Sequence, residues 1–343
     1  MRGGVSVVVP TYNRAALIGE TLDRILAQTT PPAEVIVVDD GSTDDTPAVL
    51  ARYGDRIRAE RIANSGELAA RNYGVALARG MLIAFCDSDD LWQPDHLSRM
   101  SALWEREPEL TAAYANFRIV EGGVWRERTK FDDAPEGYWR DLRKVGDEAG
   151  VFDRPVVDLL IRFMPFFPSA LVVHADRFRA LGAWDAAVNR WMSQDLATAL
   201  RLAEHPPLGV LLAPTVGIRK HPGNFSADVQ KVNLGDARVL DYVLATRPSL
   251  APHAEAIRAS IVRRRLDALE LAFARRDWAG VREILALLPA EAVRGKRRLK
   301  ARIAALPSAL REPLARGLLA LGTVKSALLG GPRASSAAAR PSA

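Results

Sequence analysis

The stretch MLIAFCDSDDLW, residues 81–92, joins an apolar run directly to three carboxylates. Residues 81–86 have the length and continuous hydrophobicity of a strand that is buried on both faces. Asp87, Asp89 and Asp90 follow where this strand would end. Carboxylates so close together raise each other's pKa unless a cation lies between them. The stretch therefore predicts a buried strand whose carboxyl end carries an acidic cluster in need of a counterion.

Three other strand-like segments come earlier in the chain, at residues 5–9, 34–40 and 56–62. Segments with apolar residues at helical spacing separate them, and another helix is expected at 94–106. This alternation predicts an α/β fold with a mostly parallel sheet and helices on both faces. Ligands bind such sheets at the carboxyl ends of the strands. The polar clusters PTYN, DDGSTDD and DSDD each follow a strand directly.

The remaining sequence is less regular and then becomes helical. Residues 110–120 are expected to form another strand, 126–155 a mobile segment over the site, and 208–221 a final pair of strands. After about residue 235 the chain is rich in Ala, Leu and Arg, and Asp277 is expected to cap a helix there. We predict four parts: 1–115 and 116–235 as halves of one α/β domain, 236–330 as a basic helical extension, and 331–343 as a disordered tail.

Composition limits the class of protein. The only cysteine among the 343 residues is Cys86, which excludes an internal disulfide and a cysteine zinc cluster. The first residues do not resemble a signal peptide, because their apolar run stops at Pro10. No apolar stretch reaches the roughly 18 residues of a membrane span. These features lead us to expect a cytoplasmic protein.

Each polar cluster has a structural and a functional interpretation. Asp87 and Asp89 suit Mg²⁺ or Mn²⁺ with substrate phosphate, but aspartates in such a turn also accept backbone N–H groups. Tyr12 offers a ring to a nucleobase, or the PTYN segment simply begins a helix. Asp40 can accept a hydrogen bond from a base N–H, or belong to an Asp-rich turn. Arg71 can balance a nucleotide's charge, or be a surface arginine.

Taken together, four motifs resemble the family 2 glycosyltransferases, which have the GT-A fold. The motifs are VSVVVPTYNR (5–14), VIVVDDGSTDDT (35–46), NSGELAARNYG (64–74) and LIAFCDSDDLWQPDHL (82–97). The resemblance is strong over about residues 4–100 and looser over 100–225. It implies a Rossmann-like sheet in which residues 1–115 bind a nucleotide-diphospho-sugar and 116–235 bind the acceptor.

The resemblance also implies roles for individual residues. Asp87 and Asp89 match the family's D-x-D motif for the metal and the diphosphate, with Asp89 favoured as the direct ligand of Mn²⁺ or Mg²⁺. The base site would be lined by the following residues: Pro10, Thr11, Tyr12, Asp40 and Arg71.

Two later segments extend the resemblance. RWMSQDLATALRLA (190–203) resembles the family's acidic motif, usually Glu-Asp, so that Asp195 matches the catalytic base and Gln194 departs from the commoner Glu. RKHPGNFS (219–226) resembles the closing segment. By that match His221 contacts the metal or the diphosphate, and Arg219, Lys220 and Ser226 contact phosphate.

The expected function is therefore that of an inverting, metal-dependent, hexosyltransferase-like enzyme in cell-surface polysaccharide or glycolipid synthesis. A sugar-nucleotide pyrophosphorylase uses a similar sheet, but its Gly-rich loop after the first strand is absent. A non-catalytic nucleotide-sugar or glycan-binding module is the third possibility. The presence of Asp87, Asp89 and Asp195 together argues against it.

Charge is unevenly distributed along the chain. Residues 255–343 contain 18 Lys and Arg against 7 Asp and Glu, a net of +11, which leaves a net of −5 for residues 1–254. The basic stretches RRR (263–265) and RGKRRLKAR (294–302) are interpreted either as a solvated helical face or as attachment to anionic lipid on the inner face of the membrane. Lipid would bring lipid-linked sugar acceptors to the site. No nucleic acid is expected, because stacking aromatics are lacking.

Overall fold

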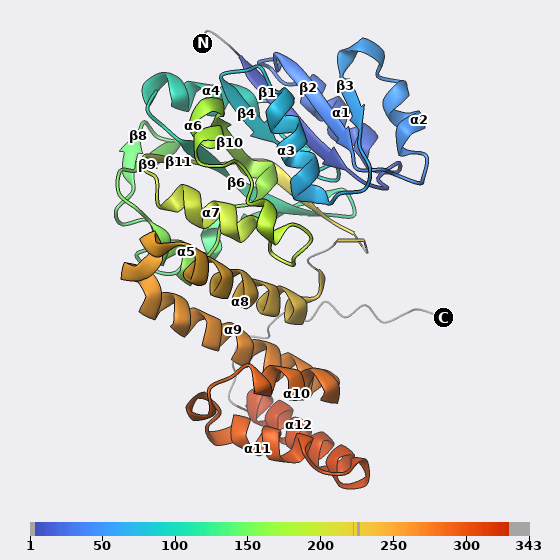
Figure 1. Cartoon of the computed structure of the whole chain (residues 1–343), viewed down its shortest axis with the longest axis vertical. Coiled ribbons are helices and arrows are strands. Elements are labelled where there is room, and N and C mark those ends of the chain that lie inside the picture. The colour runs from blue at the N-terminus through green and yellow to red at the C-terminus, as the bar shows by residue number, and fades with distance from the viewer. Residues whose placement is uncertain (1–3, 222, 225–226, 329–343) are drawn as a thin grey trace. The chain divides into compact units, whose positions relative to one another are not determined.

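The computed structural model describes residues 4–221, 223–224 and 227–328. Contacts divide the chain into two compact units, Met1–Ile261 and Val262–Ala343. Within the described part of the first unit, eleven strands form one mixed sheet in the order β3-β2-β1-β4-β10-β6-β11-β9-β8, with β5 paired to β11 and β7 paired to β6 (Figure 1).

The strands have the following bounds: β1 Val5–Thr11, β2 Glu34–Asp39, β3 Arg58–Arg61, β4 Leu82–Phe85, β5 Leu91–Trp92, β6 Ala112–Glu121, β7 Val124–Thr129, β8 Arg143–Val145, β9 Ala149–Phe152, β10 Leu171–His174 and β11 Leu208–Lys220. The helices of the first unit are α1 Ile18–Leu26, α2 Thr46–Ala51, α3 Glu67–Leu77, α4 His96–Arg106, α5 Val157–Arg162, α6 Ala175–Ala180, α7 Asp195–Ala203 and α8 Val229–Thr246. Helix α9, Ala254–Arg275, crosses into the second unit, which continues with α10 Trp278–Ala286, α11 Gly295–Ala304 and α12 Ser308–Leu328.

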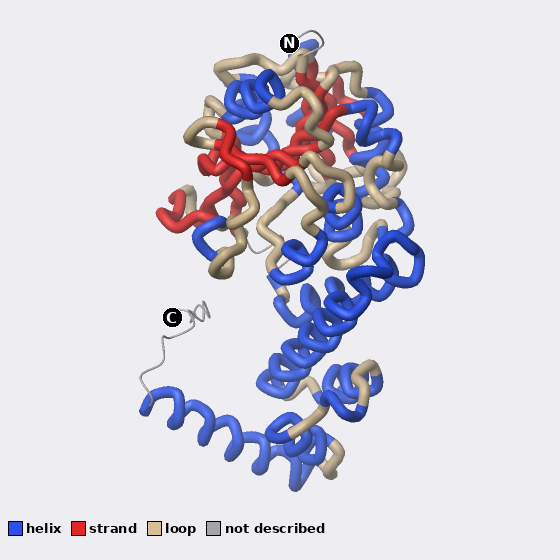
Figure 2. The backbone as a smooth tube through the Cα atoms, turned by 90° about the vertical axis from the view of Figure 1, so that its left-hand side faces the viewer, coloured by secondary structure: helices blue, strands red, loops and turns tan. Residues whose placement is uncertain are grey.

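The first half of the sheet is parallel, as the sequence predicts. Strands β3, β2, β1 and β4 pair in parallel, and the side chains of β2, β1 and β4 alternate between two cores. Val8 packs in the core that contains residues of α3, α6 and α7. Val7 and Val9 pack in the core that contains residues of α1, α2 and α4. Figure 2 shows the strands as a layer with helices on both sides. Burial of both faces explains why β1, β2 and β4 are largely apolar, whereas the edge strand β3 is charged and partly exposed.

The second half of the sheet corrects two expectations. Residues 126–155 are expected to be a mobile cover, but they contain most of β7 and all of β8 and β9, and β9 pairs with β11. Residues 208–221 are expected to be a strand pair, but Leu208–Lys220 is one strand whose register shifts on either side of Pro214. Proline lacks the N–H that a ladder hydrogen bond needs, so the strand bulges there and continues.

The topology brings the predicted site segments to one edge of the sheet. Strands β1, β2 and β4 are parallel neighbours, so their carboxyl ends lie at the same edge. Strand β5 follows the acidic loop directly and pairs with β11 through Leu91 and Gly217. The end of β11 therefore runs beside the acidic loop, although the two segments are far apart in the sequence.

Close packing of α3 on β1 requires glycine at position 74. An added Cβ there would lie 2.4 Å from Cγ1 of Val8, a stiff β-branched side chain in the strand. We expect Gly74→Ala to lower the free energy of unfolding by about 1–3 kcal/mol through overpacking. Denaturant unfolding of this variant measures the effect. Gly317→Ala is the control, because no heavy atom lies within 4 Å of its added Cβ; equal losses in both variants would contradict the packing argument.

The second unit is helical and has its own small core. Phe273, Val281, Ile284 and Ile303 are buried in it, and Asp277 caps α10 by accepting a hydrogen bond from Gly280 N at 2.9 Å, as predicted. The expected disordered tail, 331–343, lies outside the described residues. Among the described helices, none combines the length and the apolar character that crossing a bilayer demands.

Candidate active site

The three carboxylates after β4 point to three different sets of partners. Asp87 accepts a hydrogen bond from Arg71 Nη2 at 2.6 Å. Asp89 Oδ2 lies 2.9 Å from His221 Nε2 and 3.3 Å from Arg14 Nε. Asp90 Oδ1 accepts from the backbone N–H of Arg219 at 2.9 Å. Three neighbouring aspartates thus join three distant segments at the edge of the sheet: α3, the loop after β1 and the end of β11.

Asp90 has a structural role. Its side chain is buried, with 4% exposed, and it also accepts a hydrogen bond from the Ser169 hydroxyl. Burial, together with the charges of Asp89 and Asp87, raises its pKa well above the usual range. Because Asp90 ties the acidic loop to the 3-10 helix Pro168–Ala170 and to the end of β11, it holds the segment that carries His221 close to Asp89.

Asp89 and His221 have the chemistry of a divalent metal site. A carboxylate oxygen and an imidazole nitrogen at 2.9 Å are both suitable ligands for Mn²⁺, and the remaining positions of such ions are commonly filled by substrate phosphate and water. Among the described residues, no three His, Cys, Asp or Glu side chains are grouped to hold a metal without substrate. The residues present therefore fit a metal that is held jointly with a diphosphate.

The rest of the closing segment contributes positive charge. Arg219 Nη1 pairs with Glu20 Oε2 at 3.2 Å, while Nε and Nη2 are buried without a hydrogen-bond partner. Lys220 is half-buried at the end of β11. Ser226, the third predicted phosphate contact, lies outside the described residues. A guanidinium with two unsatisfied nitrogens next to the acidic loop is suited to an anionic ligand.

The PTYN segment forms one side of the site. Pro10 and Thr11 are buried at the end of β1, and Tyr12 follows with 43% of its surface exposed. Asn13 has a positive φ of 52°, and its side-chain oxygen accepts a hydrogen bond from Thr43 N at 2.7 Å. This ties the loop after β1 to the loop after β2. Tyr12 is left with an open ring face that a planar ligand can use.

Asp40 fixes the start of α3. Its two carboxylate oxygens accept hydrogen bonds from Ser65 N at 2.6 Å and Gly66 N at 2.8 Å. Its side chain is therefore engaged with the backbone, as the structural interpretation of a turn aspartate requires. Each carboxylate oxygen retains a second lone pair that can accept a hydrogen bond from a nucleobase. The contact of Asp40 with a base remains a prediction.

Arg71 is a buried cation and not a surface arginine. Only 1% of it is exposed. It hydrogen-bonds Asp87 and Glu67, and its guanidinium lies over the ring of Trp184 at 4.9 Å. It is therefore the countercharge of the acidic residues around it. Its predicted contact with the nucleotide base stays a prediction.

Asp195 is the first residue of α7 and is half-buried. Burial raises its pKa to about 6; Arg71 acts in the opposite direction, while Asp236 and Asp87 add to the increase. Ser193 has a positive φ of 61°, and Gln194 takes the N-cap position of α7 without a side-chain cap. Asp195 is thus a carboxylate with a raised proton affinity in the electrostatic field of Arg71 and Asp87.

Sequence reasoning missed three residues of this site. Arg14 directly follows PTYN in the sequence, and this neighbourhood could have identified it as a site residue. Glu67 lies four residues before Arg71, the spacing of a helical ion pair. Ser169 had no sequence signal. In the nearby aromatic stretch FMPFFPS (163–169), Phe166 belongs to the core, because it is buried and stacks on Tyr114 at 4.0 Å.

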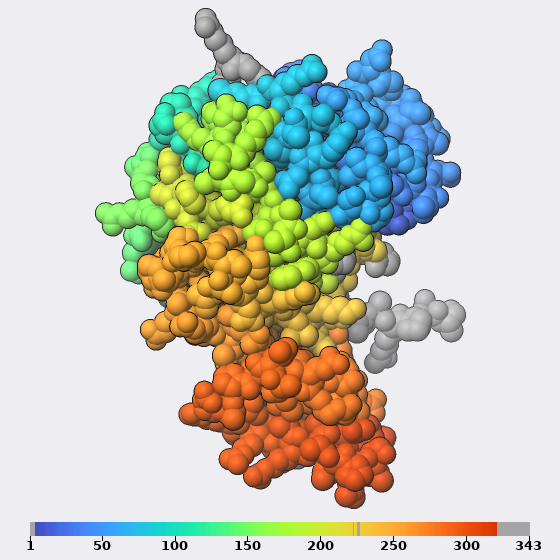
Figure 3. Space-filling model, in the orientation of Figure 1, coloured from blue at the N-terminus to red at the C-terminus, as the bar shows by residue number. Residues whose placement is uncertain are grey.

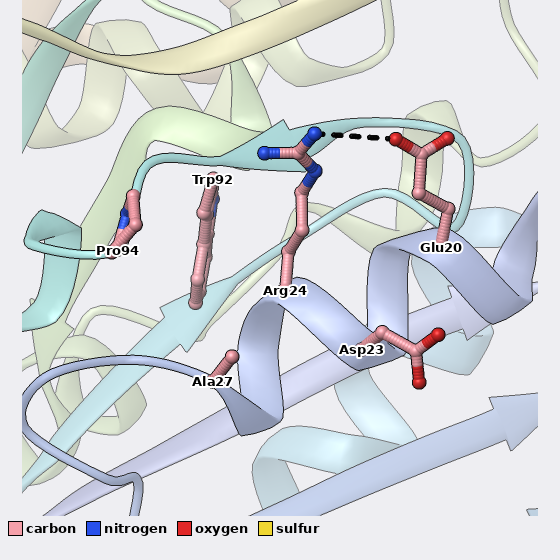
Figure 4. Close-up of a pocket in the computed structure, with 6 residues that line it drawn as sticks. All are labelled: Glu20, Asp23, Arg24, Ala27, Trp92 and Pro94. Atoms are coloured by element: carbon pink, nitrogen blue, oxygen red, sulfur yellow. Dashed lines mark hydrogen bonds and ion pairs between the residues drawn. The ribbon is translucent and has the colours of Figure 1, made fainter.

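A separate pocket of about 350 Å³ lies between α1 and the segment that starts at β5 (Figure 4). Its lining residues are Glu20, Asp23, Arg24, Ala27, Trp92 and Pro94. None of them is a predicted site residue. The candidate active site is therefore defined by its polar contacts and not by this pocket.

The sheet order, the acidic loop after β4 and the arrangement of α3 and α7 define a GT-A type fold, the fold of nucleotide-sugar transferases. Residues 6–166 match the sequence profile described as glycosyl transferase family 2. Over that region the chain is similar to this family.

Curated relatives match part of the chain. A validoxylamine A glucosyltransferase of Streptomyces hygroscopicus subsp. limoneus is 28% identical over 274 residues, which cover 72% of this chain and 58% of the relative. TuaG of Bacillus subtilis, whose name assigns it to teichuronic acid biosynthesis, is 41% identical over 142 residues, which cover 40% of this chain and 55% of TuaG. The chain thus spans less than two thirds of the length of these relatives.

Two solved structures share the fold. TarS 1-349 of S. aureus in complex with UDP-GlcNAc is 18% identical, covers 92% of each chain and gives a TM-score of 0.61. The mannosyltransferase PcManGT of Pyrobaculum calidifontis in complex with GDP-Man and Mn²⁺ is 23% identical, covers 89% of this chain and 85% of that one, and gives a TM-score of 0.51.

Proposed function

We propose that the protein transfers a sugar from a nucleotide-diphospho-sugar to an acceptor hydroxyl, with inversion at the anomeric carbon. The observation that carries the proposal is that one buried cation, Arg71, interacts with two predicted site residues, Asp87 and Asp195. Arg71 is bonded to Asp87 of the acidic loop, and it also acts on the half-buried Asp195. The match of residues 6–166 to the family 2 profile and the fold shared with structures solved with UDP-GlcNAc or GDP-Man support a nucleotide-sugar donor.

In this proposal the donor lies along the carboxyl edge of the sheet. Its base stacks on Tyr12 near Asp40, and its diphosphate reaches Asp89, His221 and Arg219. A divalent ion, Mn²⁺ or Mg²⁺, held by Asp89 and His221 supplies Lewis-acid stabilisation of the leaving diphosphate when it is bound. Arg71 orients the side chain of Asp87, which lies in the same acidic loop, through their hydrogen bond.

Asp195 is the proposed general base. A neutral hydroxyl is a weak nucleophile, and a carboxylate within hydrogen-bond reach accepts its proton as attack develops. Attack from the side of Asp195 on a donor whose diphosphate lies at the acidic loop is a direct displacement, which inverts configuration. A base whose pKa is about 6 has more affinity for the proton than an ordinary aspartate.

The proposal implies a defined pH dependence. General-base catalysis needs Asp195 deprotonated, so kcat/KM should be constant well above pH 6 and fall as the pH drops through about 6. Burial is the main cause of the raised pKa, Asp236 and Asp87 add to it, and Arg71 opposes it. The measurement is kcat/KM between pH 4.5 and 8.5 in a constant-ionic-strength buffer. Activity that stays level down to the usual aspartate range, roughly pH 4, would contradict this assignment.

Release of nucleoside diphosphate tests the function itself. Purified protein is incubated with UDP-glucose, UDP-GlcNAc or GDP-mannose, with and without Mn²⁺, and the liberated diphosphate is measured. Slow donor hydrolysis, increased by an acceptor, is expected of a transferase. Binding without release would favour a non-catalytic nucleotide-sugar-binding module. Release of pyrophosphate and sugar phosphate in the presence of nucleoside triphosphate would favour a pyrophosphorylase.

We further propose that the basic helical region binds anionic lipid at the inner face of the cell membrane, where it would meet glycolipid or lipid-linked polysaccharide acceptors. Leu299, Leu310 and Leu314 are 46–56% exposed on α11 and α12. Four exposed cations lie in the same region, at Arg294, Lys296, Arg298 and Arg302. Apolar side chains among cations suit the interface of an anionic bilayer. The name of TuaG supports a role in cell-surface polysaccharide synthesis.

Co-sedimentation with phosphatidylglycerol vesicles tests this partner. The full chain is expected to bind, and replacement of the four exposed cations by Gln should reduce binding strongly, because each contributes about 1 kcal/mol near an anionic surface. Phosphatidylcholine vesicles are the control. Equal binding of both proteins to anionic vesicles would overturn the lipid proposal and leave the proposed chemistry intact.

A further inference from the structure

Hydrogen bonds join the start of α3 to the segment that precedes Asp195. Asn189 Nδ2 donates to Ser65 O at 2.6 Å, and Arg190 Nη2 donates to Asn64 O at 2.7 Å. Figure 3 shows the surfaces of these two segments adjoining, although more than 120 positions separate them in the chain. We call residues 64–67 together with 189–194 the latch. The latch links the loop held by Asp40 to the loop that carries Asp195.

Glu67 is the central member of the latch. One carboxylate oxygen accepts a hydrogen bond from Arg71 Nη2, and the other accepts from Gln194 Nε2 at 2.7 Å. Gln194 is buried, and its amide oxygen accepts from the backbone N–H of Arg190 at 2.8 Å. The amide nitrogen of Gln194 is therefore bonded to α3 and its amide oxygen to its own loop. Asp195 is the next residue in the chain.

Local backbone strain indicates that this geometry is imposed by its contacts. Arg190 and Ser193 adopt φ values of 68° and 61°, a region that is unfavourable for residues other than glycine. Such conformations cost on the order of 1–3 kcal/mol each and persist where the surroundings over-determine them. At Gly66, φ is 96° and an added Cβ would lie 2.5 Å from Asn189 Oδ1, so glycine is what allows the two segments to approach.

From these contacts we infer that Glu67 is a positioning residue for the transfer reaction. Its carboxylate holds the amide of Gln194, and through it the segment that presents Asp195, while it shares Arg71 with Asp87. This inference rests on the proposed function. It also accounts for the amide at position 194: a Glu there would face the carboxylate of Glu67 across 2.7 Å, and two carboxylates at that distance repel each other.

The pair can be tested by exchanging its partners. In the double variant Glu67→Gln/Gln194→Glu the new amide at 67 still accepts from Arg71 and donates to the new carboxylate at 194, which still accepts from Arg190 N. We expect each single variant to lower kcat by about tenfold or more, and the two effects to be strongly non-additive, as is typical of residues in contact. The exchange should restore kcat to within about threefold of the wild type. KM for the donor should change little in all three.

Controls separate positioning from a general effect on folding. Glu127→Gln removes an exposed carboxylate from β7 and should leave kcat unchanged. Thermal unfolding is measured for every variant. Wild-type kcat in both single variants, or no recovery in the exchange while the wild type is active, would overturn the role of Glu67. A wild type that releases no nucleoside diphosphate from any sugar nucleotide would instead overturn the proposed function, so the two failures are distinguishable.

Discussion

Asp195→Asn is expected to lower kcat by about 10²–10⁴-fold, the usual contribution of a positioned general base. Asparagine has nearly the same shape, so α7 should keep its start at residue 195, but the amide cannot accept the acceptor's proton. The donor makes its proposed contacts with the acidic loop and Tyr12, so its affinity should change by less than about threefold. Steady-state kinetics and calorimetric titration with the same sugar nucleotide give the two quantities.

The matched control for this variant is Asp176→Asn. Asp176 also lies in the first turn of a helix, α6, but it is exposed and pairs only with Arg179 at 3.1 Å. Its replacement should leave kcat unchanged. Turnover by Asp195→Asn within about threefold of the wild type, well short of a general base's contribution, would remove Asp195 from the role of base. A fall in donor affinity equal to the fall in kcat would place Asp195 in donor binding instead.

Asp89→Ala is expected to abolish the increase in donor affinity that Mn²⁺ produces in the wild type. Loss of a metal that stabilises the diphosphate removes several kcal/mol, so kcat/KM should fall by about 10³-fold or more. Asp89 and His221 are the two proposed protein ligands, and their ligand atoms lie 2.9 Å apart. The variant removes the carboxylate ligand and leaves only His221. Titrations of wild type and variant with UDP-GlcNAc or GDP-mannose, in Mn²⁺ and in EDTA, measure the effect.

A second variant separates the metal from the ion pair of Asp89 with Arg14, whose Nε lies at 3.3 Å. Arg14→Gln removes that pair and keeps both proposed ligands. It should retain the response to Mn²⁺. If Asp89→Ala keeps the wild-type increase in donor affinity with Mn²⁺, then Asp89 is not a ligand. If Arg14→Gln abolishes that increase as completely as Asp89→Ala does, then loss of the ion pair is enough to account for the effect of Asp89→Ala.

Much of this site could be predicted because its signals are local. Strands β1, β2 and β4 of the parallel half are apolar runs that lead into polar residues, and parallel neighbours must end at one edge. The positions of Asp40, Asp87 and Asp89 follow from that rule alone. Their placement at this edge is found in the structure, whereas their roles toward a donor remain predictions.

The parts that could not be predicted depend on distant partners. Asp87, Asp89 and Asp90 look equivalent in the sequence, and only Ser169 and Arg219 make Asp90 the structural one. For the same reason Arg71 could be taken for a surface residue, because its burial depends on Trp184 and Asp87. The charged composition of residues 126–155 suggests mobility, yet β9 pairs with β11 through backbone bonds that composition does not reveal.

The most direct test of the account is a crystal of the full chain soaked with MnCl₂ and UDP-GlcNAc or GDP-mannose, with anomalous data that locate manganese. The account predicts one manganese peak between the Asp89 carboxylate and His221 Nε2, in contact with the donor's diphosphate, with the anomeric carbon facing Asp195. A donor bound elsewhere, or bound at this edge with no manganese beside Asp89, would contradict it.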